Sequence, residues 1–283
     1  MTRIRLAFSP DADDAFMFWA ALEGRIDVEG LGFEARTADT ETLNAEAERG
    51  EVDVVAISIA QYARVADRYL LLPHGGSVGE GYGPVLVSTR PASAIRLEGA
   101  RIGVPGLRTT GYLVLRILAP SFQPVVLPIS PHTAVFEALE SGRVDAALLI
   151  HEGRLTYESR GLYRVLELGE AWRARTSLPL PLGGNVIRRG LGAKIVSRTS
   201  RVLRASISYA LAHRQEAMDA ILAQPAAASA GLDRATLDRY LAMYANDRTL
   251  DYGEDGRRAI ERLLAEAHRV GLSATIVTPE FSD

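Results

Sequence analysis

Two segments in different thirds of the chain carry the same residue pattern, and this internal repeat constrains the fold more than any other feature of the sequence. Gly50-Glu-Val-Asp53-Val-Val-Ala-Ile-Ser58 and Gly142-Arg-Val-Asp145-Ala-Ala-Leu-Leu-Ile150 each contain a glycine, a charged residue, a Val-Asp pair and an apolar run. A glycine that ends a helix just before a short apolar run is typical of a helix leading into a buried strand. We therefore expect the same helix–strand unit at two places in the fold.

The segments around the two copies alternate between strand and helix patterns in the same order. In the first third we expect strands at residues 3–8, 32–36 and 52–58 and helices at residues 13–22 and 40–49. In the middle third we expect strands at residues 101–104, 125–129 and 144–150 and helices at residues 109–118 and 133–140. Such alternation predicts an α/β fold with two lobes, each a mainly parallel sheet flanked by helices.

We expect two crossovers to join the lobes. Proline-bearing stretches near residues 84–91 and 178–186 flank the middle third, and the chain after residue 186 becomes helical. The pattern predicts a discontinuous first lobe, residues 1–90 and 186–283 with a helical C-terminal part, and an inserted second lobe of residues 91–185. This is the plan of the two-lobed periplasmic-binding-protein type II-like fold, in which the ligand cleft lies between the lobes.

Charge and composition limit the kinds of partner. The 32 basic and 35 acidic residues are spread along the chain for a net charge of −3, so we expect no nucleic acid and no membrane as partner. We expect no export, because the first residues contain no apolar stretch of signal length, and the sequence has no apolar run of the ~20 residues that a membrane span needs and no cysteine. These features are compatible with a reducing cytoplasm, which is the location we expect. They leave open whether the chain forms a homodimer.

Ligands of open parallel sheets bind beyond the carboxyl ends of the strands, where loops lead into helices. The expected strands place four loops there: Ser9–Asp14, the segment from Ser58, Pro105–Gly111, and the loop that begins at His151. We expect the binding site where these loops meet.

The loop before the expected helix at 109–118 contains small and hydroxyl residues. The free amides at the start of that helix, with the hydroxyls of Thr109 and Thr110 and the adjacent Gly111, could hold a carboxylate or a phosphate. The alternative is that Thr109 only caps the helix. The glycine spacing matches neither a Walker loop nor a dinucleotide fingerprint, so it predicts no nucleoside triphosphate chemistry.

Asp11, Asp13 and Asp14 bring three carboxylates together at the start of the first expected helix. Helix capping is the simplest role for them, and hydrogen bonding of Asp13 or Asp14 to sugar hydroxyls is the second. No further ligands stand at a recognisable metal-binding spacing, so we expect no metal.

His151 follows an almost wholly apolar strand, which places its imidazole at the carboxyl end of the sheet and toward the expected cleft. A neutral imidazole with a pKa near its reference value of about 6.5 is suited to taking a proton at physiological pH. The alternative is a structural histidine, which is the role we expect for the others, His74 among them. No zinc-peptidase or serine-hydrolase motif is present.

Several blocks spread over the whole chain are similar to one enzyme family. They are Ile150-His-Glu-Gly-Arg-Leu-Thr-Tyr157, Thr176-Ser-Leu-Pro-Leu-Pro-Leu-Gly-Gly184, Phe8-Ser-Pro, Glu41-Thr-Leu-Asn44, Val104-Pro-Gly106 and Ser208-Tyr-Ala-Leu-Ala-His213. With these blocks the chain resembles the 1,4-dihydroxy-6-naphthoate synthase family, which acts late in the futalosine route to menaquinone.

The resemblance implies a lyase that converts cyclic dehypoxanthine futalosine to 1,4-dihydroxy-6-naphthoate without a metal or an organic cofactor. It implies that His151 is the proton acceptor and that Ala56, Ile57 and Ser58, with Thr110 and Gly111, contact the substrate. The expected partner is thus a small molecule that bears a carboxylate and sugar hydroxyls. We hypothesise that His151 removes a substrate hydroxyl proton and that Thr110 and nearby amides hold the carboxylate.

The sequence also departs from that family at the expected cleft. Other members often carry Lys where Ala56 stands and Cys-Pro-Asn-Asp where this chain has Asp11-Ala-Asp-Asp14. Both changes make the cleft more acidic, and so they put the exact substrate or its affinity in question.

Two other interpretations stay open at this point. Chorismate dehydratase, a sister family of the same pathway on the same fold, lacks the His-Glu block. A non-catalytic small-anion-binding protein would use the same fold and close on its ligand without chemistry.

Overall fold

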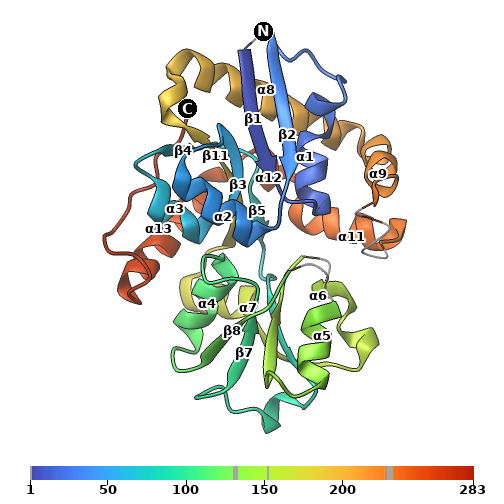
Figure 1. Cartoon of the computed structure of the whole chain (residues 1–283), viewed down its shortest axis with the longest axis vertical. Coiled ribbons are helices and arrows are strands. Elements are labelled where there is room, and N and C mark those ends of the chain that lie inside the picture. The colour runs from blue at the N-terminus through green and yellow to red at the C-terminus, as the bar shows by residue number, and fades with distance from the viewer. Residues whose placement is uncertain (1, 130–132, 152, 226, 228–231) are drawn as a thin grey trace.

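The computed structural model shows two lobes, one above the other in Figure 1, each built around one β-sheet. The structure describes residues 2–129, 133–151, 153–225, 227 and 232–283. Both ends of the chain lie in the first lobe, while the second lobe is formed by the middle of the chain (Figure 1). The predicted two-lobed fold class is confirmed.

The first lobe contains a six-stranded sheet in the order β2-β1-β3-β11-β4, with β5 also paired to β11. Its strands are β1 (Thr2–Phe8), β2 (Leu31–Thr37), β3 (Val54–Ser58), β4 (Tyr69–Leu71), β5 (Ser77–Gly79) and β11 (Leu180–Arg188). The helices of this part of the chain are α1 (Ala12–Leu22), α2 (Thr40–Arg49), α3 (Ile59–Val65), α8 (Ala193–Ala212), α9 (Arg214–Leu222), α11 (Arg234–Tyr244), α12 (Asp247–Leu250) and α13 (Gly253–Arg269).

The second lobe contains a five-stranded sheet in the order β10-β6-β9-β7-β8. Its strands are β6 (Val85–Ser88), β7 (Arg101–Val104), β8 (Gln123–Val126), β9 (Ala146–Leu149) and β10 (Tyr163–Glu167). Its helices are α4 (Thr110–Leu118), α5 (Thr133–Glu140), α6 (Gly153–Thr156) and α7 (Leu168–Thr176). Three short 3₁₀ helices, Ala92–Ala94, Glu158–Arg160 and Arg189–Leu191, complete the elements named here.

The strands predicted from alternation are the parallel ones, and the strands near the predicted crossovers run the other way. β1 pairs in parallel with β2 and β3, and β7 pairs in parallel with β8 and β9. β6 enters the second sheet antiparallel to β9, and β11 enters the first sheet antiparallel to β3. Both sheets are therefore mixed and not mainly parallel as predicted, because the strands at the crossovers join them in the antiparallel direction. The residue bounds of the lobes stay a prediction.

The aspartate of the repeated Val-Asp pair makes the same hydrogen bonds in both lobes. Asp53 accepts hydrogen bonds from the backbone and guanidinium of Arg5, at 3.0 and 3.1 Å, where β3 lies beside β1. Asp145 accepts the same bonds from Arg101, both at 2.9 Å, where β9 lies beside β7. Burial alone would raise the pKa of Asp53, but the bonds from Arg5 and from Arg188 hold it below its usual value. Each aspartate thus fixes the register of a parallel strand pair.

The buried faces of the elements position the loops. The strand residues of β3 and β9 are all buried, so both strands run through the middle of their lobes and end at the space between them. α1 is buried almost throughout and packs against α8, which fixes the start of α1 at the same space. In the part of the chain that the structure describes, no helix combines the length and apolar character needed to cross a membrane.

Candidate functional site

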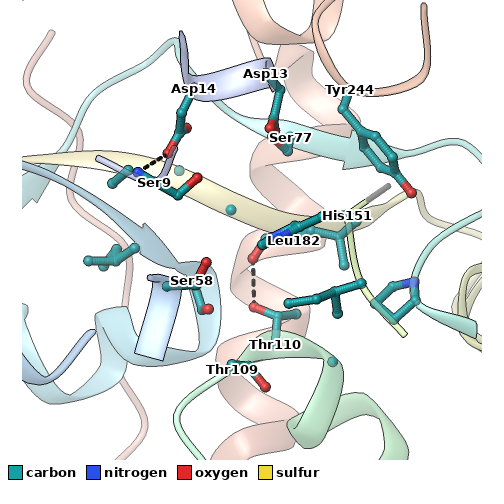
Figure 2. Close-up of a pocket in the computed structure, with 18 of the residues that line it drawn as sticks. Ser9, Asp13, Asp14, Ser58, Ser77, Thr109, Thr110, His151, Leu182 and Tyr244 are labelled. Atoms are coloured by element: carbon teal, nitrogen blue, oxygen red, sulfur yellow. Dashed lines mark hydrogen bonds between the residues drawn. The ribbon is translucent and has the colours of Figure 1, made fainter. Parts of the chain in front are cut away.

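A cavity lies between the two lobes and contains about 770 Å³ of empty space, counted out to its open mouth. All nine site residues predicted from the sequence line it: Asp13, Asp14, Ala56, Ile57, Ser58, Thr109, Thr110, Gly111 and His151. Figure 2 shows side chains of both lobes turned toward this space.

The start of α4 forms one wall. Thr109 caps the helix, because its Oγ1 accepts from the amide of Tyr112 at 3.2 Å and donates to the carbonyl of Gly106 at 2.9 Å. The Thr110 hydroxyl donates to the carbonyl of Leu182 at 2.7 Å, which Figure 2 shows, and accepts from the amide of Ala60 at 3.1 Å. Both hydroxyls are therefore engaged within the protein. The first amides of a helix have no partner inside the helix, so these amides are the groups that α4 can offer to an anion.

The end of β3 forms the facing wall. Ser58 is fixed by Asn44, whose side chain accepts from the Ser58 amide at 2.9 Å and donates to the Ser58 hydroxyl at 3.1 Å. Ala56 lines the cavity with only a methyl group, and its side chain is too short to reach a ligand with a charge. This wall therefore contributes shape and backbone groups.

The segment of residues 11–14, called the acidic loop below, carries three aspartates. At the top of Figure 2, Asp13 lies beside Ser77 and Asp14 lies beside Ser9. Asp13 accepts hydrogen bonds from the Ser77 hydroxyl at 2.6 Å and the Tyr240 hydroxyl at 3.1 Å. Asp14 accepts from the amide of Ser9 at 2.8 Å. Burial raises the pKa of both carboxyls, that of Asp14 to about 8, and the close carboxylates add to the effect.

The predicted capping role of these aspartates is wrong. Asp11 occupies the position before α1, but its side chain makes no capping hydrogen bond. Its Oδ2 instead lies 3.0 Å from Nδ1 of His151, in the other lobe. The local sequence favours capping, and only the approach of the second lobe turns this carboxylate elsewhere.

His151 follows β9 and holds a backbone conformation that is uncommon for residues other than glycine. Its φ angle is +51°, in the left-handed region that side chains with a Cβ enter at a cost of about 1 kcal/mol or more. Its side chain is 19% exposed, so the imidazole is accessible from the cavity but largely removed from bulk water. The fold therefore holds this residue in a left-handed backbone conformation beside the cavity.

Arg154 is a lining residue that the sequence did not single out. Its guanidinium donates to the carbonyl of Gly83 at 2.7 Å and to the carboxylate of Glu167 at 2.6 Å, and it stacks over the ring of Tyr82. Among the described residues that line the cavity it is the one Arg or Lys. The signal for it was its place in the block that begins at Ile150.

Tyr240 and Tyr244 of α11 also line the cavity and were not predicted. They come from the helical tail, whose amphipathic pattern shows which face is buried but not which part of the buried face meets a ligand. Over the described parts of the chain, no group of three or more His, Asp or Glu side chains is arranged to hold a metal ion.

Comparison with known proteins gives one family. The sequence profile of the menaquinone-biosynthesis family matches residues 4–269. A 1,4-dihydroxy-6-naphthoate synthase of Thermus thermophilus is 40% identical over 281 residues, which cover 99% of this chain and 100% of that protein. A protein of the same name from Streptomyces coelicolor is 37% identical, covering 95% of this chain and 94% of its own length.

Solved structures agree with the fold. A protein of Archaeoglobus fulgidus superposes with a TM-score of 0.88 at 41% identity, covering 95% of this chain and 98% of that one. An alkanesulfonate-binding protein of Xanthomonas axonopodis pathovar citri, bound to MOPS, superposes with a TM-score of 0.67 at 16% identity, over 98% of this chain and 96% of its own. The second likeness shows the binding-protein fold.

Proposed function

The chain belongs to the menaquinone-biosynthesis family and is an enzyme of that pathway, and we propose that it is the lyase that converts cyclic dehypoxanthine futalosine to 1,4-dihydroxy-6-naphthoate. The observation that carries this proposal is the cavity itself. It sets the imidazole of His151 opposite the acidic loop, with the start of α4 as a further wall. The relatives at 40% and 37% identity bear the synthase name over nearly the whole chain, which favours this reaction over that of the sister dehydratase.

Cleavage of a carbon–carbon bond beside a carbonyl needs a base for a hydroxyl proton. As the base takes that proton, the hydroxyl carbon becomes a carbonyl, the bond to its neighbour breaks, and the electron pair moves into the adjacent carbonyl as an enolate. We assign the base to His151, because an imidazole can take a proton near neutral pH and return it later. Hydrogen-bond donors placed beforehand stabilise the negative charge that develops.

The remaining groups hold the substrate. The amides at the start of α4 are assigned to the aromatic carboxylate, because a helix N-terminus favours an anion. The Thr110 hydroxyl is not assigned to it, since it already joins Leu182 and Ala60. Asp13 and Asp14 are assigned to sugar hydroxyls, which can donate to carboxyl oxygens. Tyr240 and Tyr244 add apolar ring surface and exclude water.

Turnover of cyclic dehypoxanthine futalosine tests the proposal. The purified wild type, without added metal, is expected to form 1,4-dihydroxy-6-naphthoate, followed by chromatography. His151→Gln is expected to lower kcat by about 10²–10⁴-fold, the usual contribution of a general base. His268→Gln, at an exposed histidine of α13, is the matched control and should retain turnover. Absence of product with the wild type, or a loss below about tenfold in a folded His151→Gln, would contradict the proposal.

A further inference from the structure

The contact between Asp11 and His151 joins the two lobes beside the cavity. Asp11 stands just before α1 in the first lobe, and His151 follows β9 in the second. Oδ2 of the carboxylate and Nδ1 of the imidazole are 3.0 Å apart, within ion-pair distance, and the two side chains are 12% and 19% exposed. A contact this short and this sheltered from water orients both groups.

Other helices show what Asp11 would do if its role were local. Asp39 before α2 accepts a hydrogen bond from the amide of Thr42, and Asp233 before α11 accepts one from the amide of Thr236. Asp11 has the same extended backbone before α1 but makes no such bond. An aspartate in a capping position that does not cap has its carboxylate committed to another partner, and here that partner is the imidazole.

The second carboxylate near the ring is engaged differently. Asp13 exerts a charge effect on His151, but its two oxygens accept hydrogen bonds from Ser77 and Tyr240, at 2.6 and 3.1 Å. The geometry thus separates the tasks of neighbouring acids: Asp13 is bound to its own lobe, and Asp11 reaches the other one.

We propose that Asp11 is the positioning residue of His151: its carboxylate, at ion-pair distance from Nδ1, favours the hydrogen on that nitrogen and thereby assigns proton transfer to Nε2. The bond made by one ring nitrogen decides which nitrogen carries the hydrogen, and a nearby carboxylate also stabilises the imidazolium that forms when the base takes a proton. This inference rests on the proposed function, because it takes His151 to be the base.

The two residues come from different lobes, and this determines when the imidazole is oriented. Because Asp11 and His151 belong to different lobes, their contact exists only when the lobes are together. Two-lobed binding folds close around their ligands by hinge motion. The base is therefore oriented on closure, when the substrate is already enclosed, and is released from its partner when the lobes part.

Kinetics of Asp11→Asn give the first test. This change keeps the size of the side chain and removes its charge. We expect kcat to fall at least about tenfold while KM stays within about threefold, because a positioning residue acts on the chemical step without touching substrate. Asp233→Asn, the same change at an exposed helix cap, is the control and should leave both constants near wild type. A kcat within about twofold of wild type for Asp11→Asn would overturn the proposal.

Nitrogen NMR of ¹⁵N-histidine-labelled protein gives a second test that needs no turnover. Spectra are recorded at pH 8 with and without excess 1,4-dihydroxy-6-naphthoate, and the His151 signals are identified by their loss in His151→Gln. We expect the wild type with naphthoate to show hydrogen on Nδ1, and Asp11→Asn to lose that preference. Identical His151 spectra for wild type and Asp11→Asn in both conditions would overturn the proposal. A wild type that makes no naphthoate would sink the proposed function, while the NMR comparison would still decide the role of Asp11.

Discussion

Arg108 of the second lobe reaches Glu41 of the first: its Nη1 lies 3.1 Å from Oε1 of that carboxylate. Its backbone amide also donates to Glu41 at 3.2 Å, and its Nε donates to Glu48 at 3.0 Å. Both carboxylates stand on α2. The three bonds tie the loop before α4 to the opposite lobe, next to the cavity, and so hold the two lobes together there.

Loss of this link should make closure less favourable. We expect Arg108→Gln to raise KM by about two- to fivefold with little change in kcat, because partly exposed ion pairs contribute about 0.5–1 kcal/mol. Small-angle scattering of the ligand-free variant should give a larger radius of gyration than that of the wild type. Arg96→Gln removes an ion pair within the second lobe, with Glu98, and is the control. An unchanged KM and radius for Arg108→Gln would show that the link does not govern closure.

The buried carboxyl of Asp14 should make stability depend on pH. Burial, and after it the neighbouring Asp13, raises the pKa of Asp14 to about 8, whereas an aspartate in an unfolded chain ionises near pH ~4. Between these values the folded state holds a proton that the unfolded state has lost. Stability from this group is therefore complete below about pH 4 and falls as the pH rises toward 8.

Asp14→Asn should remove this dependence, because an amide oxygen can still accept the bond from the Ser9 amide. We expect the variant to melt at least about 2 °C above wild type at pH 8, with a smaller difference at pH 5. Thermal melts followed by circular dichroism measure both. The exposed Asp67→Asn is the control. A melting difference that is equal at the two pH values would contradict the prediction.

The buried His74 should make the folded state less stable at acid pH, which is the opposite of the pH dependence expected from Asp14. It is 1% exposed, its Nε2 lies 3.1 Å from the Ser200 hydroxyl, and burial lowers its pKa to about 4. An unfolded histidine binds a proton near pH ~6.5. Stability is then fully present above that pH and is lost as the pH falls toward 4.

In His74→Gln we expect a smaller loss of the free energy of unfolding between pH 7 and pH 5 than in the wild type. Urea unfolding at the two pH values provides the measurement. His268→Gln, at an exposed histidine, should lose as much as the wild type. If His74→Gln loses as much as well, the buried imidazole does not cause the acid sensitivity.

Much of the fold follows from local pattern. The predicted helix at 40–49 and the predicted strand at 101–104 have the same bounds in the structure, because a capping residue and a glycine, or a short apolar run, mark their ends. β6 and β11 were expected only as crossovers, and β4, β5 and β10 were not predicted at all. They are short strands whose partners lie far away in the sequence, so no periodicity within the segment reveals them.

The candidate site was predictable where it depends on topology and not where it depends on contacts between lobes. Parallel strands end at one edge of a sheet, so loops after β3 and β9 had to meet a common space. The direction of the Asp11 carboxylate and the engagement of the Thr110 hydroxyl come from residues of the other lobe or the crossover. Neither contact can be predicted from the residues around it in the sequence.

The place of β11 in the first sheet has a consequence for how the chain folds during synthesis. β11 lies between β3 and β4 and also pairs with β5, so β4 and β5 cannot join β1, β2 and β3 until residues 180–188 have been made. The second sheet uses only strands from residues 85–167, a continuous stretch. Because long-range pairings form late, the inserted lobe is expected to fold first on the ribosome, and the lobe that begins the protein is expected to fold last.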